Sequence, residues 1–312
     1  MNTLYKIYFL LPHDSKFGIV SKIINRIAAR IIKRAIDYFY PEYLKRTAKS
    51  AGMGININEN RNKKYIVSLT SFPARINDVW ISIETIFRQS FKPDKVILWL
   101  SEKQFEGQKL PQNLLNLVDR GLTIRYVNED LRSHKKYIYA IEEFPNDYII
   151  TLDDDLYYEK NLILNLVNLK KEYPEYVPTN RAHKIKITDN IIEPYRKWFH
   201  NATDIAPSNL LVQTGGNGTL YCKNDLFKDF NSVQIIKELA PYADDIWLKI
   251  MVLKAQKKIV TNIKYNKDPL VVKATQNEKL VTQNVINGGN DTQFNNLLKH
   301  YQLSAKDFTD AI

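Results

Sequence analysis

A short apolar run that ends in three consecutive carboxylates constrains the fold of this chain more than any other stretch. The run is Tyr148–Leu152, and Asp153, Asp154 and Asp155 follow it directly. Such a run is typical of a buried strand, and ligands of open α/β sheets bind beyond the carboxyl ends of strands. Because adjacent carboxylates repel and their oxygens suit hard cations, the stretch predicts a Mg²⁺ or Mn²⁺ site that also takes a diphosphate. The alternative is a solvated acidic turn.

Strands and helices alternate upstream of this run. The pattern predicts strands over Tyr65–Thr70, Lys95–Leu100 and Leu122–Val127, with helices over 77–89, 110–119 and 135–144. Strands joined by helices through short loops form βαβ units and hence a parallel sheet. Neither G-x-G-x-x-G nor a P-loop sequence follows these strands, which disfavours dinucleotide and P-loop NTPase sites. We therefore expect an α/β domain whose central sheet is mostly parallel and is flanked by helices.

Residues 1–60 are expected to form a basic amphipathic helical appendage and a linker. Isoleucines at helical spacing face one side and basic residues the other, which suits either an anionic membrane surface at residues 19–43 or packing on the main domain. The net charge of +11 agrees with a membrane or a phosphorylated substrate, and the continuous apolar face argues against nucleic acid. The isoleucines are Ile19, Ile23, Ile24, Ile27 and Ile31, and the basic residues are Lys22, Arg26, Arg30, Lys33 and Arg34.

The compartment is expected to be the cytoplasm, with the chain either free or peripheral on the inner face of the cell membrane. No stretch reaches the roughly 18 apolar residues that cross a bilayer. The single cysteine, Cys222, excludes an internal disulfide framework and a cysteine-based zinc site.

Two further segments lie downstream of the acidic run. The sequence Gly215-Gly216-Asn217-Gly218 either approaches a ligand closely or forms a hairpin turn. Asp244-Asp245 opens a helix, where the two acids either stabilise its N-terminus or hold a general base. The stretch 174–207 is expected to be irregular, followed by a strand over 259–263 and a final helix, Thr292–Tyr301, in a tail of residues 266–312.

Taken together, four segments resemble a GT-A glycosyltransferase, similar to family 2 enzymes of bacterial polysaccharide assembly. They are Ser68–Pro73, Asp153–Asp155, Gly215–Gly218 and Ala243–Leu248, and the resemblance spans about residues 64–265. It implies a Rossmann-like catalytic domain over 61–265. The appendage at 1–60 and the tail at 266–312 lie outside it.

The resemblance also implies roles for single residues. Asp153 would contact the nucleotide ribose and, with Asp155, the metal, while Asp154 supports them. Asp244-Asp245 stands where the family has a Glu-Asp pair whose second member is the general base. Asp245 is therefore the first choice for the base. Because Asp244 replaces the Glu of the family, which of the two acids takes the proton stays open. The nucleoside pocket would be lined by Thr70, Ser71, Phe72 and Arg75. The sugar and acceptor side would be shaped by Gly215, Gly216 and Asn217. Candidates for phosphate or donor contacts, which could instead be solvated charges, are Lys135, Lys136, Arg181 and His183.

The reaction that these features imply moves a sugar from a nucleoside-diphosphate donor, with UDP favoured, to a hydroxyl of a glycan or lipid-linked glycan. The cofactor would be Mn²⁺ or Mg²⁺, and in-line attack would invert the anomeric centre. The alternatives are a metal-dependent phosphatase, nuclease or nucleotidyltransferase, a sugar-nucleotide pyrophosphorylase, and a non-catalytic protein of the membrane surface. Scattered histidines disfavour a two-metal site, and Ser71-Phe72-Pro73 is not the glycine-rich loop of a pyrophosphorylase.

Overall fold

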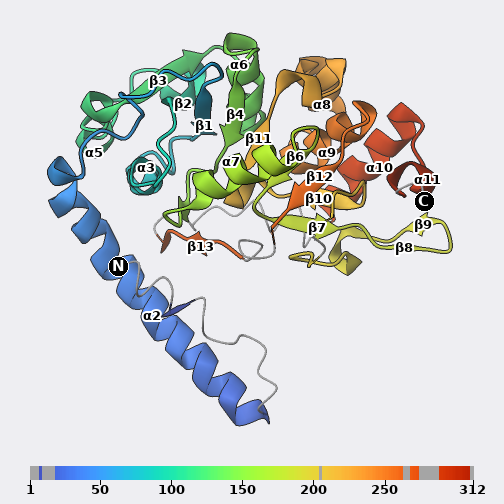
Figure 1. The fold of residues 1–312 in the computed structure, drawn as a ribbon, viewed down its shortest axis with the longest axis horizontal. Coiled ribbons are helices and arrows are strands. Elements are labelled where there is room, and N and C mark those ends of the chain that lie inside the picture. The colour runs from blue at the N-terminus through green and yellow to red at the C-terminus, as the bar shows by residue number, and fades with distance from the viewer. Residues whose placement is uncertain (1–6, 9–17, 204–205, 263–267, 274–287, 310–312) are drawn as a thin grey trace.

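The chain folds around a seven-stranded sheet with helices on both faces (Figure 1). The computed structural model describes residues 7–8, 18–203, 206–262, 268–273 and 288–309. The strand order in this part is β12-β6-β11-β4-β1-β2-β3. The strands are β1 Tyr65–Thr70, β2 Lys95–Ser101, β3 Leu122–Val127, β4 Tyr148–Thr151, β6 Val177–Thr179, β11 Thr219–Tyr221 and β12 Ile259–Thr261.

Most neighbours in the sheet are parallel. β3, β2, β1 and β4 run side by side in one direction, β11 is antiparallel to β4 and to β6, and β12 is parallel to β6. The helices are α2 Gly18–Thr47, α3 Val79–Phe87, α4 Glu102–Phe105, α5 Gln112–Leu115, α6 Lys135–Glu143, α7 Leu162–Glu172, α8 Val233–Leu239, α9 Asp244–Lys254, α10 Gly289–Tyr301 and α11 Ala305–Phe308.

Three small two-stranded sheets accompany the central one. They pair β5 Leu156–Tyr157 with β13 Leu270–Val271, β7 Ala182–Lys184 with β10 Leu211–Gln213, and β8 Ile187–Thr188 with β9 Ile191–Ile192. The stretch 174–207 therefore holds β6 to β9, and the expectation that it is irregular was wrong. Strands of two or three residues are too short to show a period in the sequence.

The order of the strands creates a switch point between β1 and β4. From β1 the chain adds β2 and β3 on one side, and α6 then carries it back to β4 on the other side of β1. At such a point the connections diverge, and a crevice opens beyond the carboxyl ends of the two strands. Ser71, which follows β1, and Asp153–Asp155, which follow β4, therefore meet at one edge of the sheet.

Both faces of the sheet are buried, which explains the continuous apolar runs of its strands. Along β1, Val67 and Leu69 pack with α3, α7 and the buried side of α2. Ile66 points to the other face and packs with α6, α9 and α10. This alternation fixes the register, because a slip by one residue would exchange the two faces.

The predicted fold class is confirmed: the chain is α/β, with a mostly parallel central sheet flanked by helices and with an N-terminal helix. β1 and β3 have the predicted bounds and β2 is one residue longer. Predicted helices over 77–89, 135–144 and 292–301 are found within three residues of those bounds, and the helix over 110–119 is reduced to α5 and a 3₁₀ turn, Val118–Arg120. Ile263, the predicted end of β12, lies outside the described residues, and the division at 60 and 265 stays a prediction.

Helix α2 is anchored to the domain along its C-terminal half. Ile36 and Leu44 are fully buried there, and the Arg88 guanidinium donates to the Leu44 carbonyl at 3.1 Å. Figure 1 shows the N-terminal half of α2 extending away from the body of the molecule. Within the described residues, no helix is both long and apolar enough to cross a bilayer.

A buried histidine ties α6 to the loop before α9. His134 Nε2 lies 2.8 Å from the Ala240 carbonyl oxygen, and Nδ1 lies 2.8 Å from the Tyr137 hydroxyl. Because a carbonyl only accepts, Nε2 carries the proton and Nδ1 accepts from the tyrosine. Burial lowers the pKa of His134 to about 4, so the fold holds the neutral ring.

Acidification should therefore destabilise the fold through His134. The unfolded histidine takes up a proton near its ordinary pKa of 6.5, whereas the folded ring resists protonation until about pH 4, so stability is lost as pH falls through this window. Between about pH 6.5 and 4.5 we expect this group to remove about 2 kcal/mol of unfolding free energy, measured by urea denaturation. His134→Asn should lack this part of the loss, and the exposed control His300→Asn should retain it. Equal pH dependence of all three proteins would contradict the assignment.

Candidate functional site

The three acids after β4 have different surroundings. Asp154 is buried: Ser71 Oγ donates to its Oδ2 at 2.6 Å, and Arg75 Nη1 donates to its Oδ1 at 2.7 Å. The Ser82 hydroxyl donates to the Asp154 carbonyl at 2.9 Å. The middle acid therefore joins the end of β4 to the segment after β1 and to α3, and its carboxylate is fully engaged by the protein.

Asp155 shares Arg75 with Asp154. Its Oδ2 lies 3.0 Å from Arg75 Nη1, and its side chain is largely buried. Burial raises the pKa of Asp155 to about 7, because Arg75 offsets only part of that cost and the carboxylates of Asp153 and Asp154 add to it. A carboxyl group with a raised pKa beside other acids marks a place where further positive charge would be stabilised.

Asp153 points toward the second acidic pair. Lys136 Nζ lies 2.7 Å from Asp153 Oδ1 and 3.0 Å from Asp244 Oδ2. The lysine side chain is 5% exposed, whereas that of Asp153 is 34% exposed and open to a ligand. Burial alone would lower the pKa of Lys136, but Asp153 and Asp244 raise it well above its usual value, so the ammonium stays charged. One buried cation thus joins the two acidic clusters, which the sequence separates by about 90 residues.

The glycine-rich segment lies between the same groups. The Gly215 amide donates to Asp245 Oδ1 at 2.9 Å. A Cβ at Gly215 would lie 2.9 Å from Lys136 Nζ and 3.2 Å from Asp245 Oδ1. The lysine cannot yield without losing its ion pairs, so this position requires glycine. At Gly216 a Cβ would meet Leu156, Pro269 and Asp153 at 3.4 to 3.7 Å, which are ordinary contacts.

The acids at the head of α9 do more than stabilise the helix end. The residue before them, Ala243, offers no side-chain cap, and their carboxylates reach Lys136 and Gly215. Burial raises the pKa of Asp245 to about 8, and the neighbouring Asp244 carboxylate adds to the shift. Burial also disfavours the charged form of Asp244, yet Lys136 and then His134 hold the pKa of that group below its usual range. The pair therefore contains one poor base and one good one.

The segment 268–273 returns to this edge of the sheet. The Val272 amide donates to the Asp155 carbonyl at 2.8 Å, where β13 pairs with β5. Asp268 Oδ1 lies 2.7 Å from the Arg181 guanidinium, which also donates to Asn201 Oδ1 at 2.8 Å. Residues that the sequence assigned to a tail thus form one wall of the site.

The remaining predicted residues lie at varying distance from the chemistry. The Thr70 hydroxyl donates to the Trp99 carbonyl at 2.8 Å, and the Arg75 guanidinium stacks 5.3 Å from the Phe72 ring. Lys135 pairs with Asp130 at 2.5 Å. Burial lowers the pKa of His183 to about 3, so its ring is neutral. The Asn217 carbonyl accepts from the buried Asn180 side chain, which shapes the glycine-rich turn.

A divalent cation would suit this charge distribution. Arg75 and Lys136 carry two positive charges, against the five carboxyl groups of Asp153, Asp154, Asp155, Asp244 and Asp245. Within the described ranges no three histidine, cysteine or acidic side chains converge as a complete metal cage. Mg²⁺-type sites take only one or two carboxylates from the protein, and substrate phosphates and water complete the shell of the ion. Asp153 and Asp155 fit such a role.

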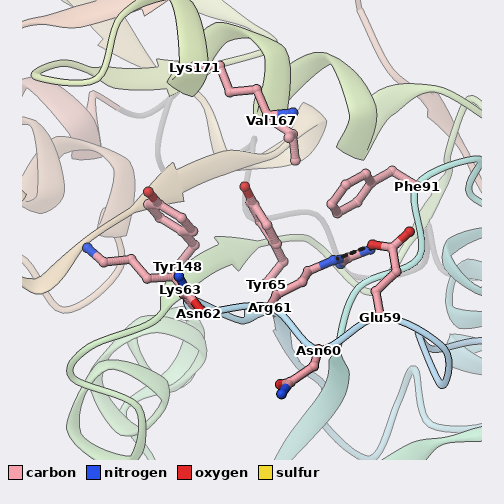
Figure 2. A pocket seen from close by; sticks show the side chains of 10 residues that line it. All are labelled: Glu59, Asn60, Arg61, Asn62, Lys63, Tyr65, Phe91, Tyr148, Val167 and Lys171. Carbon is pink, nitrogen blue, oxygen red and sulfur yellow. Dashed lines mark hydrogen bonds and ion pairs between the residues drawn. The ribbon is translucent and has the colours of Figure 1, made fainter.

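A hollow of about 540 Å³ lies at the opposite end of the strands (Figure 2). It is lined by Tyr65 and Tyr148, the first residues of β1 and β4, and by the loop before β1. At 3.3 Å per residue, the five steps of β1 separate it from Thr70 by about 16 Å. Arg61 in this hollow is already paired with Glu59 at 2.8 Å, as the dashed line in Figure 2 marks. Its lining holds no acidic cluster, and the acids that follow β4 and those that begin α9 lie at the other edge.

Comparison with known proteins adds a broad likeness. No family model and no curated protein matches the sequence. Similar solved structures include the mannosyltransferase PcManGT from Pyrobaculum calidifontis in complex with GDP-Man and Mn²⁺, at 12% identity and a TM-score of 0.49, covering 91% of this chain and 77% of that one. Residues 1–349 of S. aureus TarS match at 12% identity and a TM-score of 0.42, over 66% of this chain and 59% of that one. These two likenesses do not single out family 2. At these values, function must be argued from this chain's own residues.

The sequence did not reveal that Lys136 joins the two clusters, nor that Asp268–Val272 reaches the site. Lys136 was considered only for phosphate or donor contacts, and a lysine in a helix is normally solvated. A signal was present, because Lys136 precedes Ile138 and Ile141 in an amphipathic pattern that places it near the sheet.

Removing the Lys136 charge should destabilise the protein strongly. Lys136→Met leaves the largely buried Asp244 carboxylate and the partly exposed Asp153 carboxylate without their partner, for which we expect a loss of about 3 kcal/mol in urea denaturation at neutral pH. The deficit should shrink at lower pH, because the unpaired acids then take up protons. Lys135→Met is the matched control: its partner Asp130 is 30% exposed, much as Asp153 is, and no largely buried carboxylate such as Asp244 depends on it, so the loss should be clearly smaller. Equal losses in both variants would show that Lys136 is not a special bridge.

Proposed function

We propose that this protein is a metal-dependent glycosyltransferase of the GT-A type that uses a nucleoside-diphosphate sugar. The observation that carries the proposal is the joining of two acidic clusters, Asp153–Asp155 and Asp244-Asp245, at the switch point of the sheet. In a doubly wound sheet this is where nucleotides bind. Moving a sugar from a diphosphate to a hydroxyl needs two acidic clusters. One would hold the cation that offsets the charge of the leaving diphosphate, and the other would take the proton of the attacking hydroxyl.

The donor would lie along the crevice between β1 and β4. Ser71 and Arg75 hold the end of β4 against the segment after β1, so the nucleoside wall is rigid. Asp153 and Asp155 would bind Mn²⁺ or Mg²⁺, which offsets the charge of the departing diphosphate. Arg181, which pairs with Asp268, would contact the diphosphate or sugar. UDP is the nucleotide to test first, and GDP next.

The acceptor would approach from the head of α9. As its hydroxyl oxygen forms a bond to the anomeric carbon, the bond from that carbon to the diphosphate oxygen breaks, and the hydroxyl proton passes to a carboxylate. In its ionised form Asp245 is the stronger base, because its pKa is raised whereas Lys136 holds the pKa of Asp244 below its usual range. The Gly215 amide orients Asp245 and leaves room for the sugar. Attack opposite the leaving group inverts the anomeric centre.

We propose that the acceptor is a glycan or lipid-linked glycan and that the enzyme works in the cytoplasm, peripheral to the inner face of the membrane, in polysaccharide biosynthesis. Support comes from the long basic helix α2, which packs on β5 and β13 next to Asp155. Lys33 Nζ donates to the Val271 carbonyl at 3.1 Å, and the Tyr40 and Tyr157 rings lie 5.5 Å apart.

A panel of UDP-, GDP- and other nucleotide sugars, assayed for release of the nucleoside diphosphate with and without Mn²⁺, tests the function. We expect one donor to be hydrolysed or transferred, loss of activity with EDTA, and recovery on adding metal. Asp245→Asn should bind that donor with unchanged affinity and lose about 10²–10⁴-fold in transfer rate. The exposed control Asp119→Asn should match the parent protein. If no donor is turned over or bound with metal, the proposal is wrong, and full transfer by Asp245→Asn would refute the assignment of the base.

A further inference from the structure

The outward side of α2 carries a stripe of isoleucines that nothing in the described structure covers. Ile23, Ile27 and Ile31 follow one another at four-residue spacing and are 51%, 50% and 61% exposed, and Ile24 beside them is 59% exposed. Side chains four apart share one face of a helix. Tyr38 continues the stripe seven residues after Ile31 and is 76% exposed. Side chains of Ile19 and Lys22 lie outside the described residues.

Arginines flank this stripe. Arg26 and Arg30 are exposed and lie at one edge of the apolar face, and Arg34, which is also exposed, lies between Ile31 and Tyr38. The helix has no acidic residue before Asp37, and Asp37 is occupied by Lys33 at 2.7 Å. The apolar stripe therefore has a border of uncompensated positive charge.

In the C-terminal half of the helix, the opposite side is turned to the domain. Ile36 is 1% exposed and packs in the core there, and Ala29, which is 8% exposed, lies on the same side of the helix, away from the isoleucine stripe. The anchoring of α2 through Leu44, Lys33 and Tyr40 fixes which face looks outward. The isoleucines thus do not serve the packing of the helix, although packing on the domain was one of the two explanations that the sequence allowed for an amphipathic segment.

We propose that α2 docks lengthwise on an anionic phospholipid surface, with Ile23, Ile24, Ile27 and Ile31 inserted below the headgroups. Arg26, Arg30 and Arg34 would contact the lipid phosphates, and Tyr38 would lie at the headgroup level, where aromatic rings with a polar tip are favoured. Insertion buries apolar area, and each basic side chain near the surface adds electrostatic attraction.

Charge complementarity selects this occupant over a second copy of the chain. A symmetric pair of α2 helices would bring two sets of arginines together along one apolar seam. The one acidic residue on that face of the helix, Glu42, is already paired with Arg46 at 2.7 Å. An anionic bilayer supplies both an apolar interior and the opposite charge. Docking does not depend on the proposed enzymatic function, and its test uses no sugar substrate.

The test is co-sedimentation of the full chain with vesicles of phosphatidylcholine alone and of equal parts phosphatidylcholine and phosphatidylglycerol. We expect binding to the anionic vesicles, at least about tenfold weaker binding to the neutral ones, and loss of binding as salt is raised. The triple variant Ile23→Ser, Ile27→Ser, Ile31→Ser should bind anionic vesicles at least about tenfold more weakly. The control Ile57→Ser, Ile191→Ser removes two isoleucines that are 65% and 69% exposed elsewhere, and it should bind like the parent.

A second variant guards against a misfolded helix. Arg26→Gln, Arg30→Gln, Arg34→Gln keeps the apolar stripe and should lose the preference for anionic vesicles. Absence of binding by the parent chain, or equal binding by the parent and both α2 variants, would overturn the proposal. A parent dimer in light scattering that the serine variant converts to a monomer, without vesicle binding, would overturn it in favour of a second copy.

Discussion

The ion bridge from Lys136 to Asp153 and Asp244 is the interaction on which the candidate site depends. It lies at the N-terminus of α6, the helix that carries the chain from β3 back across β1 to β4. The bridge therefore connects the topological switch of the sheet to the head of α9. Without it, repulsion between Asp153 and the pair at 244 and 245 would oppose the approach of the two segments. The same ammonium divides the two acids of α9 into one that stays ionised and one that favours a proton.

Some of this arrangement follows from sequence alone, because it rests on periodic patterns. The β-branched runs of β1 to β3 and the helices between them predict the parallel half of the sheet, and the acids after β4 follow from the apolar run before them. The parts that could not be predicted depend on long-range pairing. β6 to β9 are too short to show a period, β11 inserts antiparallel beside β4, and segment 268–273 returns to Asp155 from more than 100 residues away.

The three consecutive acids illustrate why a motif underdetermines its chemistry. Although they are adjacent in sequence, they have three different environments. The Asp154 carboxylate accepts hydrogen bonds from Ser71 and Arg75, and Asp155 forms an ion pair with the same arginine. Asp153 pairs with Lys136 and remains partly exposed. Only the outer two are placed to bind anything from solvent. The three acids therefore do not form the solvated turn that the sequence allowed, because Asp154 is buried between Asp153 and Asp155. A diphosphate with its cation is the class of ligand that this charge pattern fits.

Electron paramagnetic resonance of Mn²⁺ tests most directly whether the joined clusters form a metal–nucleotide site. The free ion gives a strong signal that falls when the ion is immobilised. With UDP, or failing that GDP or another nucleoside diphosphate, the wild-type chain should reduce this signal well beyond the effect of the nucleotide alone, and Asp155→Asn should not. If the protein leaves the signal of every Mn²⁺–nucleotide mixture unchanged, or if Asp155→Asn reduces it as the wild type does, the account of the site is contradicted.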